Sequence, residues 1–385
     1  MSPNEKRRSR GVAVLGTLAA AAAAFAALAA PAGAAVGKGE ATIVTASHGK
    51  GRTLSGQGVK LLAGAGTTGQ GNKLVLPIGE LDPGAQPSAT SAGNLRFKHG
   101  KRAIALTGIH FNLATGTLDG KLGASEVPVF MLGDGASVNG TAGSISLSEG
   151  SLRLTAEAAT ALKQKLGLKR ALVRKGVGTV WLAAQASPAL APAQTVTSGS
   201  LDWGVLAGWR KYVLGTFGPG SIGTITTAGG ATASGTLSEA SAFFSFPAAG
   251  GSYQRGLYGA ADKLALNTAG SVTFAKPGHC IIEVKFSGID VRIDGADSSL
   301  TLDSVSDIDT PAGMSCTDVP AVTTAAVKFA KLDLSGVTPT HSADGRSVSW
   351  TAIPATLTAA GGSAWGAGYL DGQALDPVTI SVGLG

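Results

Sequence analysis

Short apolar runs interrupted by glycine are the feature of this sequence that most limits its fold. Apolar and polar residues alternate along residues 73–78, 104–111 and 288–293, which is the pattern of strands with one buried face. The chain has 57 Gly among 385 residues, and clusters of Gly, Asn, Asp and Pro separate the runs at short intervals. Such spacing is typical of antiparallel sheets. The sequence therefore predicts a mainly β, or β-rich α+β, protein.

Two segments have helical spacing instead. Residues 155–167 begin with Thr155, a suitable N-cap, and their apolar residues fall on one stripe. Residues 201–217 are the second segment, with Ser200 or Asp202 in position to cap the start. We therefore expect one or two short helices in each half of the chain.

The second helical segment would present two apolar faces. One face is expected to be buried against a sheet; it comprises Trp203, Leu206, Val213 and Phe217. The other comprises Val205, Gly208, Trp209 and Tyr212. Because Gly208 has no side chain and precedes Tyr212 by one turn, a flat ligand could lie there with the phenol directed at its centre. A half-buried Tyr with its hydroxyl in water is the other interpretation.

Residues 1–34 have the three parts of a secretory signal peptide. Basic residues precede an apolar run over residues 12–30, which ends at the small residues Ala32, Gly33 and Ala34. No second apolar run is long enough to span a bilayer. We expect a secreted, extracellular protein that is either released or held at the cell wall, and that does not span the membrane after processing.

The remaining length suffices for two domains of about 100–200 residues each. An Ala/Pro stretch at residues 186–197 predicts a linker between an N-terminal β-rich domain, residues 35–185, and a C-terminal domain, residues 198–385. Residues 35–198 carry 17 Lys+Arg against 8 Asp+Glu, and residues 199–385 carry 10 against 15. The basic half suits an anionic wall polymer or is ordinary solvated surface. No basic run with interleaved aromatics indicates nucleic acid.

The two halves resemble each other weakly. Residues 93–122 can be laid over residues 270–300, because in both a Gly-led strand runs into a His turn before an apolar strand pair. An internal duplication explains this match, and so does chance. The aromatic content is unequal: all four Tyr and four of the five Trp lie in the second half. Since aromatic side chains are what flat apolar ligands pack against, a ligand site is expected there.

Six short motifs run in order through residues 198–385. The sequence reads Gly-Ser-Leu-Asp-Trp-Gly at 199–204, Trp-Arg-Lys-Tyr-Val at 209–213, Phe-Ser-Phe-Pro at 244–247, Gly-His at 278–279, Tyr-Leu-Asp-Gly at 369–372 and Leu-Asp-Pro-Val at 375–378. In this order and over this length, the segment resembles the HtaA-type haem-binding domains of secreted and surface proteins in high-GC Gram-positive bacteria.

The resemblance implies a site for ferric haem b. In such domains the motif Tyr is the axial iron ligand and the turn His supports it, which implies these roles for Tyr212 and His279. Gly208, Trp209 and Trp365 are implied as pocket residues. A phenolate is a hard anionic oxygen that suits ferric iron, and the iron with a second donor must favour the anion near neutral pH.

The segment departs from the family in three places. Gly208 stands where the family often has a Ser that contacts a haem propionate. The approach to His279, through Ala-Lys-Pro-Gly, is longer than usual. Cys280 follows directly, and with Cys316 it is one of the two cysteines of the chain. In an oxidising exterior this isolated pair predicts one disulfide.

The resulting prediction is a secreted haem-binding protein that captures or relays ferric haem for iron acquisition. Its partners would be haem and, at the surface, other haem-uptake proteins or the cell wall. The alternatives are a wall-associated structural or adhesion protein that kept the fold and lost haem, and a polysaccharide-binding module. Enzyme motifs such as Gly-x-Ser-x-Gly, Cys-x-x-Cys or His-Glu-x-x-His are absent from the sequence, which predicts no enzyme activity. The histidines His48, His99 and His110 show no metal-site spacing, and His341 is a reserve candidate for the iron.

Overall fold

The computed structural model describes residues 34–46, 53–83, 86–133, 136–141, 143–216, 221–278, 280–312, 315–366 and 368–385. The predicted signal peptide lies outside these residues except for its last position, and His48 and His279 also lie outside them. In the described part of the chain, no helix has the length and hydropathy needed to cross a membrane.

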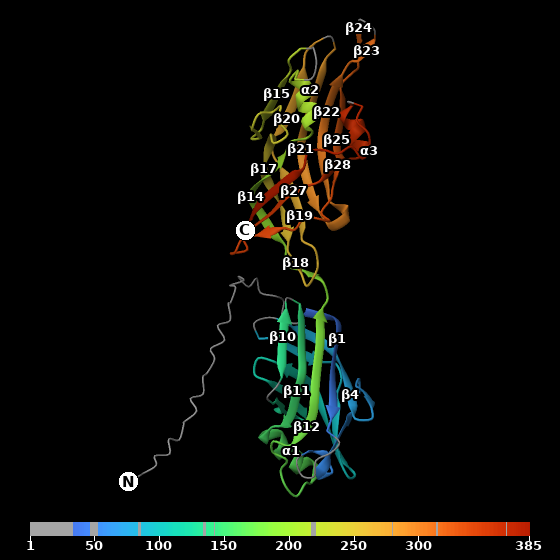
Figure 1. Ribbon diagram of the computed structural model, residues 1–385, viewed down its shortest axis with the longest axis vertical. Coiled ribbons are helices and arrows are strands. Elements are labelled where there is room, and N and C mark those ends of the chain that lie inside the picture. The colour runs from blue at the N-terminus through green and yellow to red at the C-terminus, as the bar shows by residue number, and fades with distance from the viewer. Residues whose placement is uncertain are drawn as a thin grey trace, which may run out of the picture.

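The first domain is a closed antiparallel sheet (Figure 1). Its described strands are β1 (Ala34–Thr45), β2 (Lys60–Ala63), β3 (Thr68–Gln70), β4 (Lys73–Asp82), β5 (Ser88–Ser91), β6 (Leu95–His99), β7 (Arg102–Asn112), β8 (Thr117–Leu122), β9 (Ser125–Leu132), β10 (Ser137–Thr141), β11 (Ser144–Leu154) and β12 (Gly176–Ala186). They follow the order β2-β6-β7-β5-β4-β1-β12-β11-β9-β8, and β8 also pairs with β7. The closure leaves no free edge on the ring of paired strands, and among the described strands β2, β3 and β10 keep one edge unpaired.

The second domain is built from thirteen strands of the described chain in one sheet. They are β14 (Gln194–Trp203), β15 (Thr224–Ala228), β16 (Thr232–Ser234), β17 (Phe243–Gln254), β19 (Lys263–Thr268), β20 (Ser271–Lys276), β21 (Ile282–Ile293), β22 (Ser299–Ile308), β25 (Val322–Leu332), β26 (Thr340–His341), β27 (Ser347–Ile353), β28 (Ala355–Leu357) and β29 (Val378–Leu384). Two small pairs join β13 (Ala189–Leu190) to β18 (Gly256–Leu257) and β23 (Thr310–Ala312) to β24 (Ser315–Thr317).

Few helices accompany the sheets. They are η1 (Ser55–Gln57) and α1 (Ala156–Leu166) in the first domain, and α2 (Ala207–Val213), η2 (Gly295–Asp297) and α3 (Ala359–Trp365) in the second. The mainly β prediction is therefore confirmed. Each sheet encloses its own hydrophobic core, with Phe97 and Phe130 in the first and Trp203, Trp350 and Trp365 in the second.

The two sheets share much of their pairing pattern, which supports the internal duplication, although the described β25 and β27 do not pair as β9 and β11 do. β1 pairs with β4 and β12, as β14 pairs with β17 and β29. The series β6-β7-β8-β9 corresponds to β20-β21-β22-β25. Residues 93–122 and 270–300, which the sequence comparison matched, occupy these corresponding strands. In each domain a helix, α1 or α3, precedes the last strand of the sheet.

The two predicted helices have different outcomes. The first is confirmed: the Thr155 hydroxyl accepts the Ala158 N–H at 3.1 Å, and Gly167 ends α1 in a left-handed conformation, with φ 67°. The second is shorter than residues 201–217. Residues through Trp203 belong to β14, because β17 and β29 pair with that strand on both sides and alternation buries Leu201 and Trp203.

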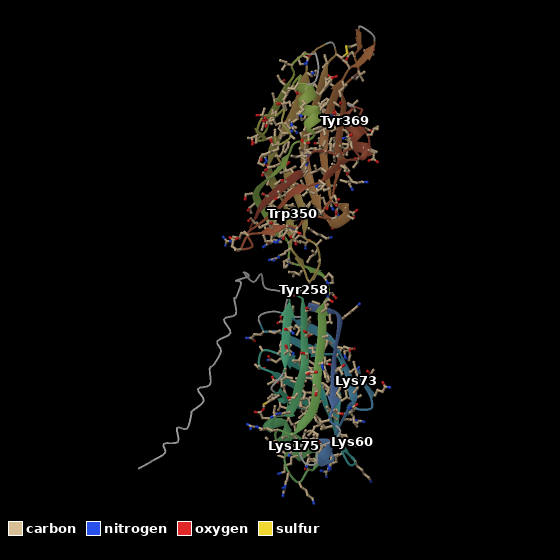
Figure 2. The ribbon with its side chains drawn as sticks, in the orientation of Figure 1. Lys60, Lys73, Lys175, Tyr258, Trp350 and Tyr369 are labelled. Carbon is tan, nitrogen blue, oxygen red and sulfur yellow. A yellow bond between two sulfur atoms is a disulfide. The ribbon has the colours of Figure 1, made fainter. Side chains whose placement is uncertain are left out.

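The segment predicted as a linker is partly strand. β14 begins at Gln194, and the Ala189–Leu190 pair bonds to Gly256–Leu257 of the second domain. Tyr258, in the turn that follows β18, packs against the core of the first domain, and Figure 2 shows it at the junction. The chain between the domains is therefore held by strand pairing over part of its length.

Candidate functional site

The helix α2 positions the predicted iron ligand. It packs on β20 and β15 and lies with α3 toward the end of the second domain that is farther from the first (Figure 1). Val213 is fully buried, whereas Gly208 and Tyr212 are exposed one turn apart, with 40% of Tyr212 accessible. The helix thus buries one face and leaves the Gly208–Tyr212 edge open. An added Cβ at Gly208 would meet no atom within 4 Å.

Four aromatic rings meet at this edge, and we call them the aromatic cluster: Trp209, Tyr212, Trp365 and Tyr369. The Tyr212 ring stacks on Trp209 with centroids 5.7 Å apart and an interplanar angle of 27°. Trp209 meets Trp365 edge to face at 5.7 Å, and Tyr369 lies 4.4 Å from Trp365. Offset and edge-to-face pairs of this kind are favourable beyond the area they bury. The structure therefore brings Tyr212, Trp209 and Trp365 together. The helical spacing in the sequence had placed only Tyr212 and Trp209 on one face.

Two buried donors in the cluster have no acceptor. The indole Nε1 atoms of Trp209 and Trp365 have no hydrogen-bond partner among the described residues, although 3% and 0% of these side chains are exposed. A buried polar group without a partner costs about 1–3 kcal/mol. Both atoms are enclosed by protein, so neither presents surface to a ligand in this structure.

Tyr369 remains protonated beside Tyr212. Burial raises the pKa of the Tyr369 hydroxyl, and the negative charge that Tyr212 would carry raises it further. A neutral phenol next to a phenolate can donate a hydrogen bond to it. In the sequence Tyr369 belongs to the Tyr-Leu-Asp-Gly motif, and no role in the site was predicted for it. A Tyr four residues after a predicted pocket Trp was the available signal.

A cation also lies against the Tyr212 ring. The Lys276 ammonium is 4.5 Å from the ring centroid and donates to the Tyr212 carbonyl at 2.6 Å. An ammonium over an aromatic face is attracted to the ring, more strongly when the ring becomes anionic. Lys276 belongs to the lengthened approach to His279. In the sequence this insertion was identified only as a departure from the family, and no role was predicted for its charge.

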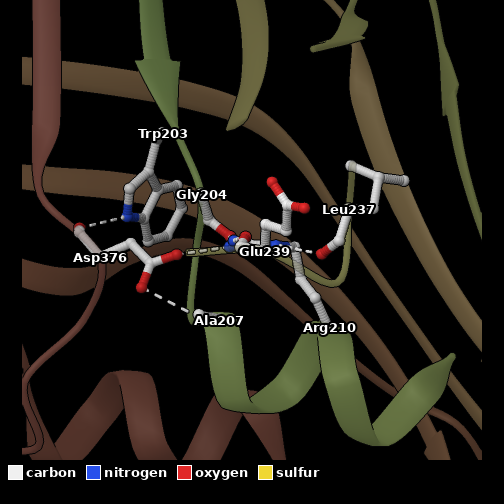
Figure 3. A network of polar contacts seen from close by, with 7 residues as sticks. All are labelled: Trp203, Gly204, Ala207, Arg210, Leu237, Glu239 and Asp376. Atoms are coloured by element: carbon white, nitrogen blue, oxygen red, sulfur yellow. Dashed lines mark hydrogen bonds and ion pairs between the residues drawn. The ribbon is translucent and has the colours of Figure 1, made fainter. Parts of the chain in front are cut away.

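A buried ion pair fixes the start of α2 (Figure 3). Arg210 is fully buried and donates to the Asp376 carboxylate, to the Gly204 carbonyl, to the Leu237 carbonyl at 2.9 Å and to the Glu239 carbonyl at 2.6 Å. Four of the five N–H bonds of the guanidinium are thus directed at oxygens, and such partners are what a buried charge requires.

Asp376 also replaces the predicted helix cap. Its second carboxylate oxygen accepts the Ala207 N–H at 3.0 Å, and its carbonyl accepts the Trp203 indole N–H at 3.1 Å. Neither Ser200 nor Asp202 caps the helix, because both lie in β14. Gly204 is required here, since a Cβ on it would lie 2.3 Å from the Asp376 carboxylate. The start of α2 is therefore set by a residue far away in the sequence.

The turn after β20 holds the disulfide. Cys280 and Cys316 are bonded, with Cα atoms 5.4 Å apart, so the predicted pairing is confirmed. His279 lies outside the described residues, and its proposed role is untested. The reserve candidate His341 is engaged elsewhere: its Nε2 lies 2.9 Å from Asp262 and 2.8 Å from the Tyr253 hydroxyl. Burial strongly raises the pKa of Tyr253. No His/Cys/Asp/Glu cluster suited to a metal ion occurs among the residues that the structure covers.

Comparison with known proteins gives one family and several structures. The family model Htaa (HtaA) matches residues 198–381, and no curated protein gives a significant match. The N-terminal domain of HtaA from Corynebacterium glutamicum is 21% identical, over 50% of this chain and 99% of that chain, with a TM-score of 0.37. The C-terminal domain of the same protein is 22% identical, over 50% and 99%, with a TM-score of 0.35. The heme binding protein HtaB from that organism is 20% identical, over 52% and 98%, with a TM-score of 0.35.

Proposed function

We propose that residues 198–381, a segment that belongs to the HtaA family, bind ferric haem b through the phenolate of Tyr212. The family match makes haem the expected ligand class. The observation that carries the proposal is the position of Tyr212: its ring is stacked on a buried Trp, yet 40% of the side chain is accessible. A ring held in this way loses little freedom on binding, and its oxygen remains available to a ligand.

The residues present fit a haem group. Tyr212 offers the hard anionic oxygen that ferric iron prefers. The open edge at Gly208 lets a flat ring approach the helix backbone, and the aromatic cluster supplies apolar surface. Gly208 cannot supply the propionate contact expected of a Ser, so the pocket rim differs from the family pattern.

Three groups support the anionic oxygen in this proposal. Tyr369 keeps its proton, since burial and Tyr212 raise its pKa, and its ring belongs to the same aromatic cluster. Lys276 places a positive charge 4.5 Å from the Tyr212 ring centroid. His279 is the third, assigned from the family resemblance alone. Groups around a metal ligand orient it and adjust its basicity, so this set would keep Tyr212 ready to ligate iron near neutral pH.

The role of the protein is capture or relay of haem outside the cell. The signal-peptide pattern of residues 1–34 supports export, with the mature protein extracellular or associated with the cell wall. Haem would supply the iron chemistry, and the chain would supply a ligand and a pocket without a reaction of its own. Partners would be haem, other haem-uptake proteins and the wall.

Hemin titration into the mature protein tests the proposal. We expect saturable binding of one hemin per chain with the absorption spectrum of tyrosinate-ligated ferric haem. An absence of saturable binding would support instead a structural or adhesion protein that kept the fold and lost the ligand. A bis-histidine spectrum would assign the iron to other residues.

A further inference from the structure

The end of the first domain that carries α1 is strongly basic. Lys and Arg side chains from β2, the β6–β7 turn, α1 and the loop after α1 form what we call the basic pole: Lys60, Lys98, Lys101, Arg102, Lys163, Lys165, Lys169, Arg170, Arg174 and Lys175. Glu157 is the one acidic residue in residues 53–60, 98–102 and 156–176. Figure 2 shows Lys60 and Lys175 at the same end of the domain.

Close contacts join the segments of the basic pole. A Cβ added to Gly58, just after η1, would lie 3.6 Å from Nε2 of His99 in the β6–β7 turn. A Cβ added to Gly167, at the end of α1, would lie 2.1 Å from the guanidinium of Arg102. The turn therefore lies between η1 on one side and the end of α1 on the other.

Two lysines of the basic pole lie directly opposite each other on adjacent strands. Lys60 of β2 and Lys98 of β6 are direct partners in the antiparallel register, and both are exposed. Like charges directly opposite each other destabilise a sheet. In the described part of the first domain an ion pair joins Lys121 to Glu126 at 3.9 Å, and no ion pair found there involves Lys60 or Lys98. The fold retains a repulsion that a bound anion would remove.

The basic pole is the counterpart of the aromatic cluster. In the shared pairing pattern η1 follows the first long strand of its domain as α2 does, the β6–β7 turn corresponds to the β20–β21 turn, and α1 corresponds to α3. The first domain has no Tyr, so it cannot repeat a Tyr ligand. The basic pole therefore has cations at the positions where the second domain has the aromatic cluster. The helices α1, at the basic pole, and α2 and α3, at the aromatic cluster, lie toward opposite ends of the molecule in Figure 1.

We propose that the basic pole binds an extended polymer that carries repeated phosphate groups. Its cations come from several segments of an exposed end. The basic pole is an exposed surface and not this domain's cavity, which lies beside Lys38 and Gln185 at the end of β12 that is farther from α1. Several cations in a row suit a multivalent anion, and Lys binds phosphate as a point charge.

Two other anionic partners fit the basic pole less well. Its segments, residues 53–60, 98–102 and 156–176, contain no Phe, Tyr or Trp on which nucleic-acid bases could stack, and His99 is their one aromatic ring. Among the described residues of these segments, one large hydrophobic side chain is exposed, that of Val173. A single Val does not provide the apolar face that insertion into a bilayer interface requires.

Charge-matched variants of the full mature chain test the proposal, with inorganic polyphosphate as the probe. Two variants neutralise the basic pole: Lys60→Gln with Lys98→Gln and Lys101→Gln, and Lys163→Gln with Lys165→Gln and Lys169→Gln. The control removes the same charge from exposed lysines elsewhere: Lys38→Gln with Lys285→Gln and Lys328→Gln. We expect each pole variant to lose roughly tenfold in affinity and to show a shallower salt dependence, and the control to bind like the wild type.

The opposed lysines give a second readout. Lys60→Gln with Lys98→Gln should raise the thermal midpoint in the absence of polymer, because a repulsion is lost, and should reduce the further rise on adding polyphosphate. Equal weakening by the control variant, or no polyphosphate binding at all, overturns the proposal. So does equal affinity for orthophosphate at matched phosphate concentration, or tighter binding to vesicles containing anionic lipid. Each of these four results would show that the basic pole is not a site for an extended phosphate polymer.

Discussion

Arg210 donates to the carboxylate of Asp376, so the helix that carries Tyr212 is joined to the residues that lead into the last strand. The two residues come from two separate motifs, Trp-Arg-Lys-Tyr-Val and Leu-Asp-Pro-Val. Their contact explains how residues far apart in the sequence combine to hold one short helix. An α-helix of this length is marginal in isolation and depends on such tertiary contacts.

Removal of Asp376 should therefore destabilise the second domain. Asp376→Ala leaves Arg210 buried without its carboxylate and the Ala207 N–H without its acceptor, for a loss of roughly 3 kcal/mol. Asp294→Ala is the matched control, because Asp294 forms ion pairs with Lys263 and Arg292 at the surface and such pairs contribute little. Chemical denaturation measures both. An Asp376→Ala midpoint as high as that of the control would show that the ion pair does not hold the helix.

The sequence predicted the β-rich fold and the first helix because each depends on local pattern. It failed at residues 201–203, where a strand runs into a short helix and both interpretations bury Trp203. Pairing of β14 with β17 and β29 decided the outcome, and no local pattern encodes that pairing. The aromatic cluster shows the same limit. Tyr212 and Trp365 were both expected in the site from the family resemblance, but Tyr369 and Lys276 reach it only through the tertiary fold.

The disulfide should be complete in the exported protein. Cys280 and Cys316 are separated by 36 residues, and closing a loop of that length stabilises the fold by roughly 3–4 kcal/mol in the loop-entropy account. Mass spectrometry of unreduced, exported protein should detect no alkylatable thiol. Two free thiols in such material would contradict both the pairing and its effect on the turn that carries His279.

The haem site should reside entirely in the second domain. Residues 194–385 contain the complete second sheet, including the start of β14, and should bind hemin alone with the affinity of the mature chain. Residues 35–193 lack Tyr and should bind little. Hemin titration of both fragments decides this, with circular dichroism as the check on folding. Saturable binding of equal strength by the first fragment would reassign the site.

Lys276 should strengthen haem binding through its charge. Lys276→Met keeps most of the stem but removes the cation beside the Tyr212 ring, a loss of about 0.5–1 kcal/mol, or roughly two- to fivefold in affinity. Lys285→Met, an exposed lysine of β21, is the control. Because the ligand binds deprotonated, apparent affinity should rise with pH. Hemin titration of both variants measures the difference, and equal affinities of Lys276→Met and the control would exclude a role for the charge.

The account depends most directly on the oxygen of Tyr212, and a hemin titration of Tyr212→Phe beside His279→Ala tests it. Tyr212→Phe keeps the ring that stacks on Trp209 but removes the atom that would reach iron, so the fold should survive while binding collapses. His279→Ala should lose roughly 10–100-fold, as is typical for groups that support a metal ligand, and should retain a weakened tyrosinate spectrum. Binding of hemin by Tyr212→Phe with wild-type affinity and spectrum would contradict the assignment of Tyr212 as the iron ligand.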